Sequence, residues 1–147
     1  MQFLIYGANG YTGELIAREA ARRGLKPILA GRSREAIEPL ARELGLESRI
    51  FGVDAPRLEG VDVVLHCAGP FSQTSAPMVS ACLAAKAHYL DITGELAVFE
   101  AVHARDAEAK RAGIALIPGV GFDVVPTDSV AAMLADSLPG ATDLVLA

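Results

Sequence analysis

The sequence is poor in aromatic residues and in basic charge, and both shortages argue against one class of function. Aromatic residues make up 5% of the 147 residues and Trp is absent, so no platform for stacking nucleic-acid bases is evident. Thirteen basic residues against eighteen acidic ones give a formal net charge of −5 at pH 7. An acidic chain is a poor general binder of phosphate backbones. We therefore expect no nucleic-acid partner.

Cysteines, metal-ligand spacings and long apolar runs are also scarce. Cys67 and Cys82 are the only cysteines, too few for a disulfide framework and in no metal-binding spacing, so we expect no metal site. No run of 18 apolar residues predicts a transmembrane helix. The opening residues lack the basic region and cleavage site of a signal peptide. These absences indicate a cytoplasmic protein with no membrane partner.

Strand-like and helix-like segments alternate along the chain, separated by Gly, Pro or short polar links. The expected strands are 3–6, 27–30, 49–53, 61–66, 88–92 and 114–117, and the expected helices are 14–23, 34–44, 77–86, 96–112 and 127–138. The segment 54–60, DAPRLEG, is too short for a helix and predicts a turn. Because parallel strands need crossover helices of right-handed sense, the pattern predicts a doubly wound parallel sheet. This is the three-layer α/β/α, Rossmann-type fold.

The segment GANGYTG, residues 7–13, places three glycines between the first strand and the first helix. A helix N-terminus presents unpaired N–H groups and favours anions. Gly7 would allow the sharp turn, Gly10 would let a diphosphate approach the backbone, and Gly13 would let the helix pack against the strand. The alternative is a purely structural turn. The same turn supplies three further candidate cofactor contacts: Asn9, Tyr11 and Thr12.

The end of the second strand reads LAGRS and bears on the choice of nucleotide. NAD-preferring sites usually carry Asp or Glu there for the ribose 2′-hydroxyl, whereas this chain has Gly31. Arg32, Ser33 and Arg34 follow, and a guanidinium can bind a 2′-phosphate. The sequence therefore predicts NADP in preference to NAD. The alternative is that the arginines are solvated charges at a helix start.

Two later loops should meet the same edge of the sheet, because the strands are parallel. Asp54 follows the third strand and would either reach the adenine or cap a turn. Ala68 and Gly69 follow the fourth strand and would let the backbone approach the cofactor. Pro70 and Phe71 would form a wall near the nicotinamide.

No residue stands out as the catalytic acid or base, so the catalytic residues stay unknown. His66 precedes the CAGP turn and lies either near the cleft or at a strand end with a structural partner. Asp91, Glu95 and Asp123 fall on loops at the carboxyl edge, where Glu95 and Asp123 are equally explained as helix-start or turn residues. None of the three tyrosines has a Lys four residues later, which argues against a short-chain dehydrogenase dyad.

With these residues in hand, the chain resembles the NAD(P)-binding domain of the saccharopine dehydrogenase and trans-acting enoyl reductase-like family. The matching segments are GANGYTGELIA, LAGRS, CAGPF, YLDITGE and PGVGFDVVPTD, and they extend from Ile5 to Asp128. The resemblance implies cofactor contacts at Gly7, Asn9, Gly10, Tyr11, Thr12, Gly13, Arg32, Ser33, Ala68, Gly69, Pro70 and Phe71. It also implies a second α/β domain that carries the substrate and dimer contacts, and it places PGVGFDVVPTD at the mouth of the site.

The expected organisation is a dinucleotide-binding domain over 1–140, followed at 141–147 by the start of the second domain, because ATDLVLA begins like a strand. We expect an NADP-dependent oxidoreductase acting on a small molecule, with a homodimer formed through the second domain. Residues 1–147 alone should bind cofactor but have little or no activity. The alternatives are an NADP(H)-sensing module without turnover and a flavin or nucleoside-phosphate binder.

Overall fold

The structure is a computed structural model that describes residues 1–145. Twelve helices and strands are assigned within this range: β1 (Phe3–Tyr6), α1 (Tyr11–Arg22), β2 (Ile28–Gly31), α2 (Arg34–Leu44), β3 (Ser48–Ile50), β4 (Val63–His66), α3 (Phe71–Ala85), β5 (His88–Asp91), α4 (Leu96–His103), α5 (Asp106–Ala112), β6 (Leu116–Ile117) and α6 (Val125–Ser137). The strands form one sheet in the order β3-β2-β1-β4-β5-β6. Every pair is parallel, as expected from the alternating segments.

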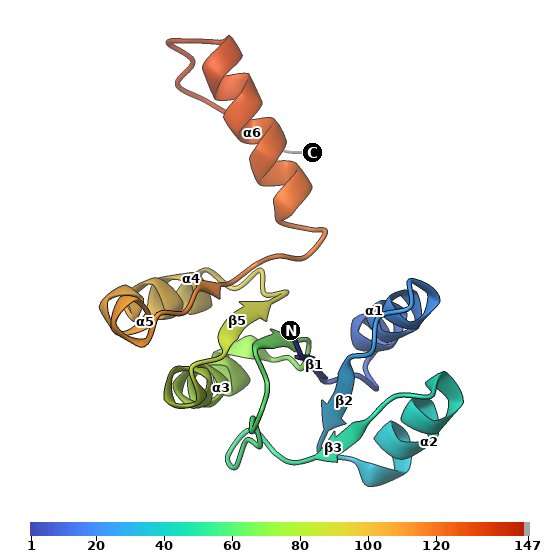
Figure 1. Cartoon of the computed structure of the whole chain (residues 1–147). Coiled ribbons are helices and arrows are strands. Elements are labelled where there is room, and N and C mark those ends of the chain that lie inside the picture. The colour runs from blue at the N-terminus through green and yellow to red at the C-terminus, as the bar shows by residue number, and fades with distance from the viewer. Residues whose placement is uncertain (146–147) are drawn as a thin grey trace.

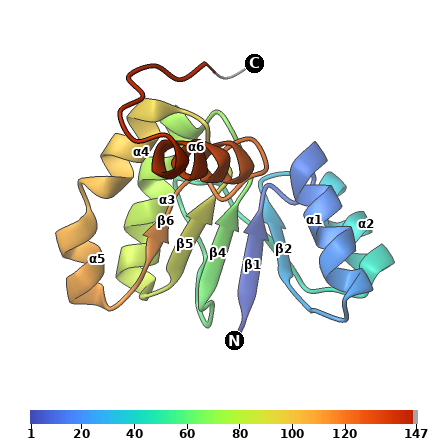
Figure 2. The same cartoon turned by 90° about the horizontal axis from the view of Figure 1, so that it is seen from above.

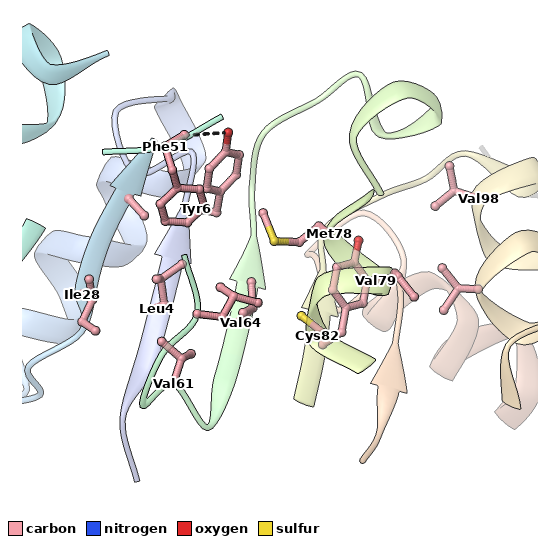
Figure 3. Packing of buried hydrophobic residues seen from close by; sticks show 14 residues of the cluster. Leu4, Tyr6, Ile28, Phe51, Val61, Val64, Met78, Val79, Cys82 and Val98 are labelled. Carbon is pink, nitrogen blue, oxygen red and sulfur yellow. Dashed lines mark hydrogen bonds between the residues drawn. The ribbon is translucent and has the colours of Figure 1, made fainter. Parts of the chain in front are cut away.

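Helices cover both faces of the sheet, which confirms the three-layer arrangement. Figure 1 shows α1 and α2 beside one face and α3, α4 and α5 beside the other. Residues alternate between the faces along β1, as strand geometry requires. Leu4 and Tyr6 pack with α3 and α4, whereas Ile5 packs with α1 and α2. Figure 3 shows how Met78 and Val79 of α3 approach the first of these two cores.

The strand order reverses at β1, where the chain leaves the β3 side and crosses to β4. Figure 2 shows β1 and β4 side by side near the middle of the sheet. In open parallel sheets, a ligand site forms at such a switch point, outside the carboxyl ends of the strands. The fold thus brings the loops after β1, β2 and β4 to one place.

Helix α3 begins at Phe71, six residues before the start predicted from the sequence, so that prediction is wrong. Pro77, taken as a first-turn residue, lies inside the helix. An internal proline removes one hydrogen bond and usually marks a boundary. Here the first turn is fixed instead by the Glu95 side chain, which accepts hydrogen bonds from the N–H groups of Phe71 and Ser72. The sequence of residues 71–77 contains no local pattern that predicts this contact.

The single helix expected over 96–112 is two helices, α4 and α5, which is a second correction. The chain leaves helical geometry at Arg105, whose ψ is 7°. The Arg105 side chain pairs with Glu108 and lies 3.3 Å from Ser80 Oγ on α3. The apolar periodicity runs through both helices and does not show the break.

Helix α6 stands apart from the sheet, as Figure 1 shows, and none of its residues 125–137 is buried. Residues 141–145, expected to begin a strand, form no strand, and residues 146–147 of that segment lie outside the described residues. None of the helices within residues 1–145 has the length and apolar character that crossing a bilayer requires.

Candidate functional site

A cavity of about 700 Å³ lies at the carboxyl ends of β1, β2 and β4, at the switch point of the sheet. Its lining comes from the loops after these strands, from the loop after β3 and from the first turn of α3. The lining residues are Tyr6, Gly7, Asn9, Gly10, Gly31, Arg32, Ser33, Gly52, Val53, Asp54, Cys67, Ala68, Gly69, Pro70, Gln73 and Thr74. The sequence-predicted residues from four separate segments are therefore brought together.

The turn after β1 is tight because Gly7 has a φ of +79°, a conformation that side chains disfavour. A Cβ at Gly7 would also lie 2.8 Å from the Cβ of Ala68. The N–H groups of Gly7 and Ala8 both donate to the carbonyl oxygen of Ala30, at 2.8 and 3.2 Å. The turn is thus fixed against β2, and the role predicted for Gly7 as a turn residue is confirmed.

Gly10 and Gly13 play different parts in the same turn. A Cβ at Gly13 would lie 2.2 Å from the carbonyl oxygen of Gly7, so the helix packs on the turn through a missing side chain. At Gly10 only the Gly7 oxygen, at 3.3 Å, would be near such an atom. Gly10 lines the cavity and Gly13 does not. Gly10 therefore leaves space in the cavity, whereas Gly13 allows α1 to pack closely against the Gly7 turn.

The N-terminus of α1 faces this turn and is suited to an anion. Gly10 is its N-cap, and within residues 1–145 no side chain caps this helix start. The first N–H groups of a helix have no intrahelical partner and carry partial positive charge. A glycine cradle at an uncapped helix start fits the diphosphate of a dinucleotide.

Gly31 ends β2 in a crowded position, which adds a packing reason for the glycine. A Cβ there would lie 3.0 Å from Cδ1 of Ile37 and 3.1 Å from Oδ1 of Asn9. A carboxylate at this position would also approach the Asn9 oxygen, another acceptor. The side chains of Ile37 and Asn9 therefore disfavour the acidic residue that an NAD site usually carries here.

Arg32 and Arg34, which the sequence treats alike, lie in different surroundings. Arg32 is exposed and lines the cavity together with Ser33. Arg34 pairs with Glu38 on α2 and lines a separate groove along β3. Ser33 is the N-cap of α2 by position, but its hydroxyl lies 3.2 Å from a Glu35 carboxylate oxygen. Of Arg32, Ser33 and Arg34, only the first two are placed to meet a ligand in the cavity.

Tyr6 and Asp54 line the same cavity as Arg32. Figure 3 shows the Tyr6 hydroxyl donating a hydrogen bond to the Phe51 carbonyl oxygen, at 3.3 Å. The two rings stack with centroids 5.2 Å apart. Burial raises the pKa of Tyr6, with Arg32 lowering it and Asp54 raising it by smaller amounts. Asp54 thus lines the cavity near the Tyr6 hydroxyl, where it is placed to meet a ligand.

The opposite wall is the turn from Ala68 to Pro70, in which the Gly69–Pro70 peptide bond is cis. The hydroxyl of Thr74 lies 2.7 Å from the Ala68 carbonyl oxygen and 3.1 Å from that of Pro70. The Nε2 atom of His66 lies 2.9 Å from the same Thr74 hydroxyl. His66 is fully buried, and burial lowers its pKa to about 4. His66 therefore supports the wall as a neutral side chain and does not line the cavity.

Some predicted contacts do not line the cavity. Tyr11 is 85% exposed at the start of α1, and Thr12 is exposed beside it. Phe71, expected in the wall near the nicotinamide, packs edge-on against the His66 ring with centroids 5.3 Å apart. Among the candidate acids, Asp91 is buried and Asp123 is exposed in the turn before α6.

Several lining residues were not singled out as contacts from the sequence. Gln73 and Thr74 belong to the first turn of α3, which the sequence assigned to a loop. Placing that helix start at Phe71 would have marked them. The others lie within two residues of predicted contacts, at or just after strand ends: Tyr6, Gly31, Gly52, Val53 and Cys67.

The sheet order, the glycine turn and the cavity at the switch point define a Rossmann-type NAD(P)-binding domain of the kind found in oxidoreductases. Residues 3–117 match the saccharopine dehydrogenase NADP binding domain, and the chain belongs to that family. The resemblance drawn from GANGYTGELIA and the other segments is therefore confirmed.

Two curated relatives and one solved structure illustrate the similarity. A saccharopine dehydrogenase-like oxidoreductase from Homo sapiens is 31% identical over 150 residues, covering 85% of this chain and 35% of the relative. A trans-acting enoyl reductase from Mycobacterium bovis is 33% identical over 138 residues, covering 85% and 33%. Saccharopine dehydrogenase (L-Glu forming) from Saccharomyces cerevisiae shares the fold, with a TM-score of 0.76 at 19% identity over 92% of this chain and 31% of that one. The chain thus spans about a third of the length of these proteins.

Proposed function

We propose that residues 1–147 are the N-terminal cofactor-binding domain of an NADP-dependent oxidoreductase. The observation that carries the proposal is that Arg32 lines the cavity next to Gly31, where the side chains of Ile37 and Asn9 disfavour an acid. A guanidinium forms charge-assisted hydrogen bonds with phosphate, and no carboxylate at residue 31 repels it. The diphosphate would lie on Gly7 and Gly10 at the start of α1.

The substrate and the residues that act on it belong, in this proposal, to a second domain that follows about residue 140. The relatives are about three times as long as the part that this chain matches, which supports such an arrangement. The substrate is a small molecule bound between the two domains, and the second domain forms a homodimer. Residues 1–147 alone would then bind cofactor and turn over little or no substrate.

The experiment is a titration of residues 1–147 with NADP and with NAD, for the wild type and for Arg32→Ala. Hydrogen bonds to charged groups contribute about 1.5–3 kcal/mol, so R32A should weaken NADP about 10- to 150-fold and change NAD little. Arg34→Ala is the matched control, because it removes the same charge two residues away and outside the cavity. Tighter binding of NAD than NADP by the wild type would reject the NADP preference.

Turnover is tested on the full-length protein by following NADPH oxidation with candidate carbonyl and enoyl compounds. Redox turnover supports the oxidoreductase. Tight NADP(H) binding without turnover would instead support a sensing module.

A further inference from the structure

The start of α3 is capped by a carboxylate from a distant loop. Glu95 lies between β5 and α4, yet its two carboxylate oxygens accept hydrogen bonds from Phe71 N–H, at 2.8 Å, and Ser72 N–H, at 3.0 Å. Pro70, the N-cap of α3, provides no side-chain cap of its own. Glu95 thus supplies both the missing cap and the negative charge that a helix N-terminus favours.

Glu95 is held in this position by the end of β5. Its own N–H donates to Thr93 Oγ1 at 3.0 Å, and Thr93 N–H donates to the buried carboxylate of Asp91 at 3.0 Å. Asp91 also accepts hydrogen bonds from the Tyr89 hydroxyl, at 2.7 Å, and from Gly119 N–H, at 2.8 Å. A chain of contacts therefore runs from the sheet, through Asp91 and Thr93, to the start of α3.

The capped turn is continuous with the cavity wall. Phe71 and Ser72 directly follow the Ala68–Pro70 segment, and Gln73 and Thr74 line the same cavity one residue later. The Thr74 hydroxyl stabilises the wall through the Ala68 and Pro70 carbonyl oxygens. Glu95 stabilises the turn that follows the wall through the N–H groups of Phe71 and Ser72. Losing the Glu95 contacts would leave two N–H groups without their partner at the base of the wall.

We propose that Glu95 is a positioning residue for the nicotinamide half of the bound dinucleotide. This inference rests on the proposed NADP site. In a sheet of this type the adenosine half lies at the end of β2, beside Arg32, and the rest of the dinucleotide crosses the switch point toward β4. The wall that Glu95 supports is on the β4 side. Glu95 does not line the cavity and would act only through the start of α3.

The test compares two ligands that share the adenosine half. Residues 1–147 are titrated with NADP and with adenosine 2′,5′-bisphosphate, as wild type, Glu95→Gln and Glu95→Ala. E95Q keeps the size of the side chain and one acceptor oxygen, so it retains the fold if E95A lowers Tm strongly. Glu100→Gln is the matched control, since Glu100 is exposed on α4 and its side chain makes no hydrogen bond or ion pair within residues 1–145.

We expect E95A to weaken NADP about tenfold and E95Q to weaken it less, with the affinity for adenosine 2′,5′-bisphosphate unchanged in both and E100Q indistinguishable from wild type. The tenfold figure lies within the range that corresponds to the loss of a helix cap. Equal losses for both ligands would show a general structural role and overturn the proposal, as would unchanged NADP affinity in both variants. If the wild type binds neither ligand, the NADP site itself is wrong. If it binds the bisphosphate alone, the adenosine half of that site stands and the assignment of Glu95 fails.

Discussion

Gly13 of α1 packs directly on Gly7 of the turn that precedes the helix. A Cβ at Gly13 would lie 2.2 Å from the carbonyl oxygen of Gly7 and 2.9 Å from its carbonyl carbon. Both clashes are with backbone, which cannot swing aside as a flexible side chain can. The spacing of these two glycines therefore sets how closely the helix start approaches the turn that lines the cavity.

Gly13→Ala should destabilise the domain. Relieving the clash requires α1 or the turn to move, and overpacking of this kind typically costs about 1–3 kcal/mol. The measurement is the free energy of unfolding in urea, with NADP affinity alongside it. A variant as stable as the wild type would show that α1 does not pack as tightly as described.

Gly10→Ala should separate binding from folding. Gly10 has a φ of −79°, which alanine adopts readily, and the added Cβ would meet only the Gly7 oxygen, at 3.3 Å. We expect a loss in stability of less than about 1 kcal/mol but at least tenfold weaker NADP binding, because the methyl group would lie where a diphosphate approaches the backbone. Unchanged NADP affinity in a folded G10A protein would place the diphosphate elsewhere.

Gly31→Asp should not convert the site to NAD preference. Its Cβ would press on Ile37 and its carboxylate would approach Oδ1 of Asn9, so the variant should lose about 1–3 kcal/mol of stability. Gly31→Ala is the control for size without charge and should account for most of the loss. Tight NAD binding by a stable G31D protein would contradict the crowding described at this position.

The free energy of unfolding should depend on pH between about 4 and 6.5 because of His66. Its pKa is about 4 in the folded state because of burial, against an ordinary 6.5. Between these values the unfolded chain binds a proton that the folded chain does not, so stability falls as pH is lowered from about 6.5 to 4. The full contribution is about 3 kcal/mol.

His66→Gln should remove most of that slope while keeping a polar partner for Thr74. The measurement is urea unfolding at several pH values. His103→Gln, on the exposed end of α4, is the matched control for removing one imidazole from the chain. An unchanged slope in H66Q would mean that His66 does not titrate as described.

The fold was predictable because its signals are local. Short apolar runs located every strand, and the ends of α2 were placed at the right residues, with Gly45 in the left-handed conformation that ends a helix. The start of α3 was not predictable. It depends on Glu95, which is 24 residues away from Phe71, and Pro77 is a misleading local signal.

The site was predictable to a similar degree and for the same reason. Glycines and strand ends pointed to Gly7, Gly10, Arg32 and the Ala68–Pro70 wall, all of which line one cavity. The direction of the Phe71 side chain was not visible in the sequence, because its ring turns inward to His66. The Arg34–Glu38 pair, in contrast, has the i,i+4 spacing of neighbours on a helix and could have been predicted from the sequence.

Cys67 should react slowly with alkylating reagents even though it lines the cavity. Burial, with a smaller effect from Asp91, raises the pKa of Cys67 to about 12, and burial raises that of Cys82 to about 12. The thiolate is the reactive form, so alkylation by iodoacetamide at pH 8 should be roughly 50-fold slower than for a free thiol, after allowing for the greater nucleophilicity of a more basic thiolate.

Peptide mapping by mass spectrometry assigns the label to each cysteine. NADP should slow the labelling of Cys67 further, whereas the labelling of Cys82, which is already inaccessible, should not change. In urea both thiols should react at the free rate, which serves as the internal control. Fast labelling of Cys67 in the folded protein would indicate an activated cysteine at the cavity and would make it a candidate for catalysis.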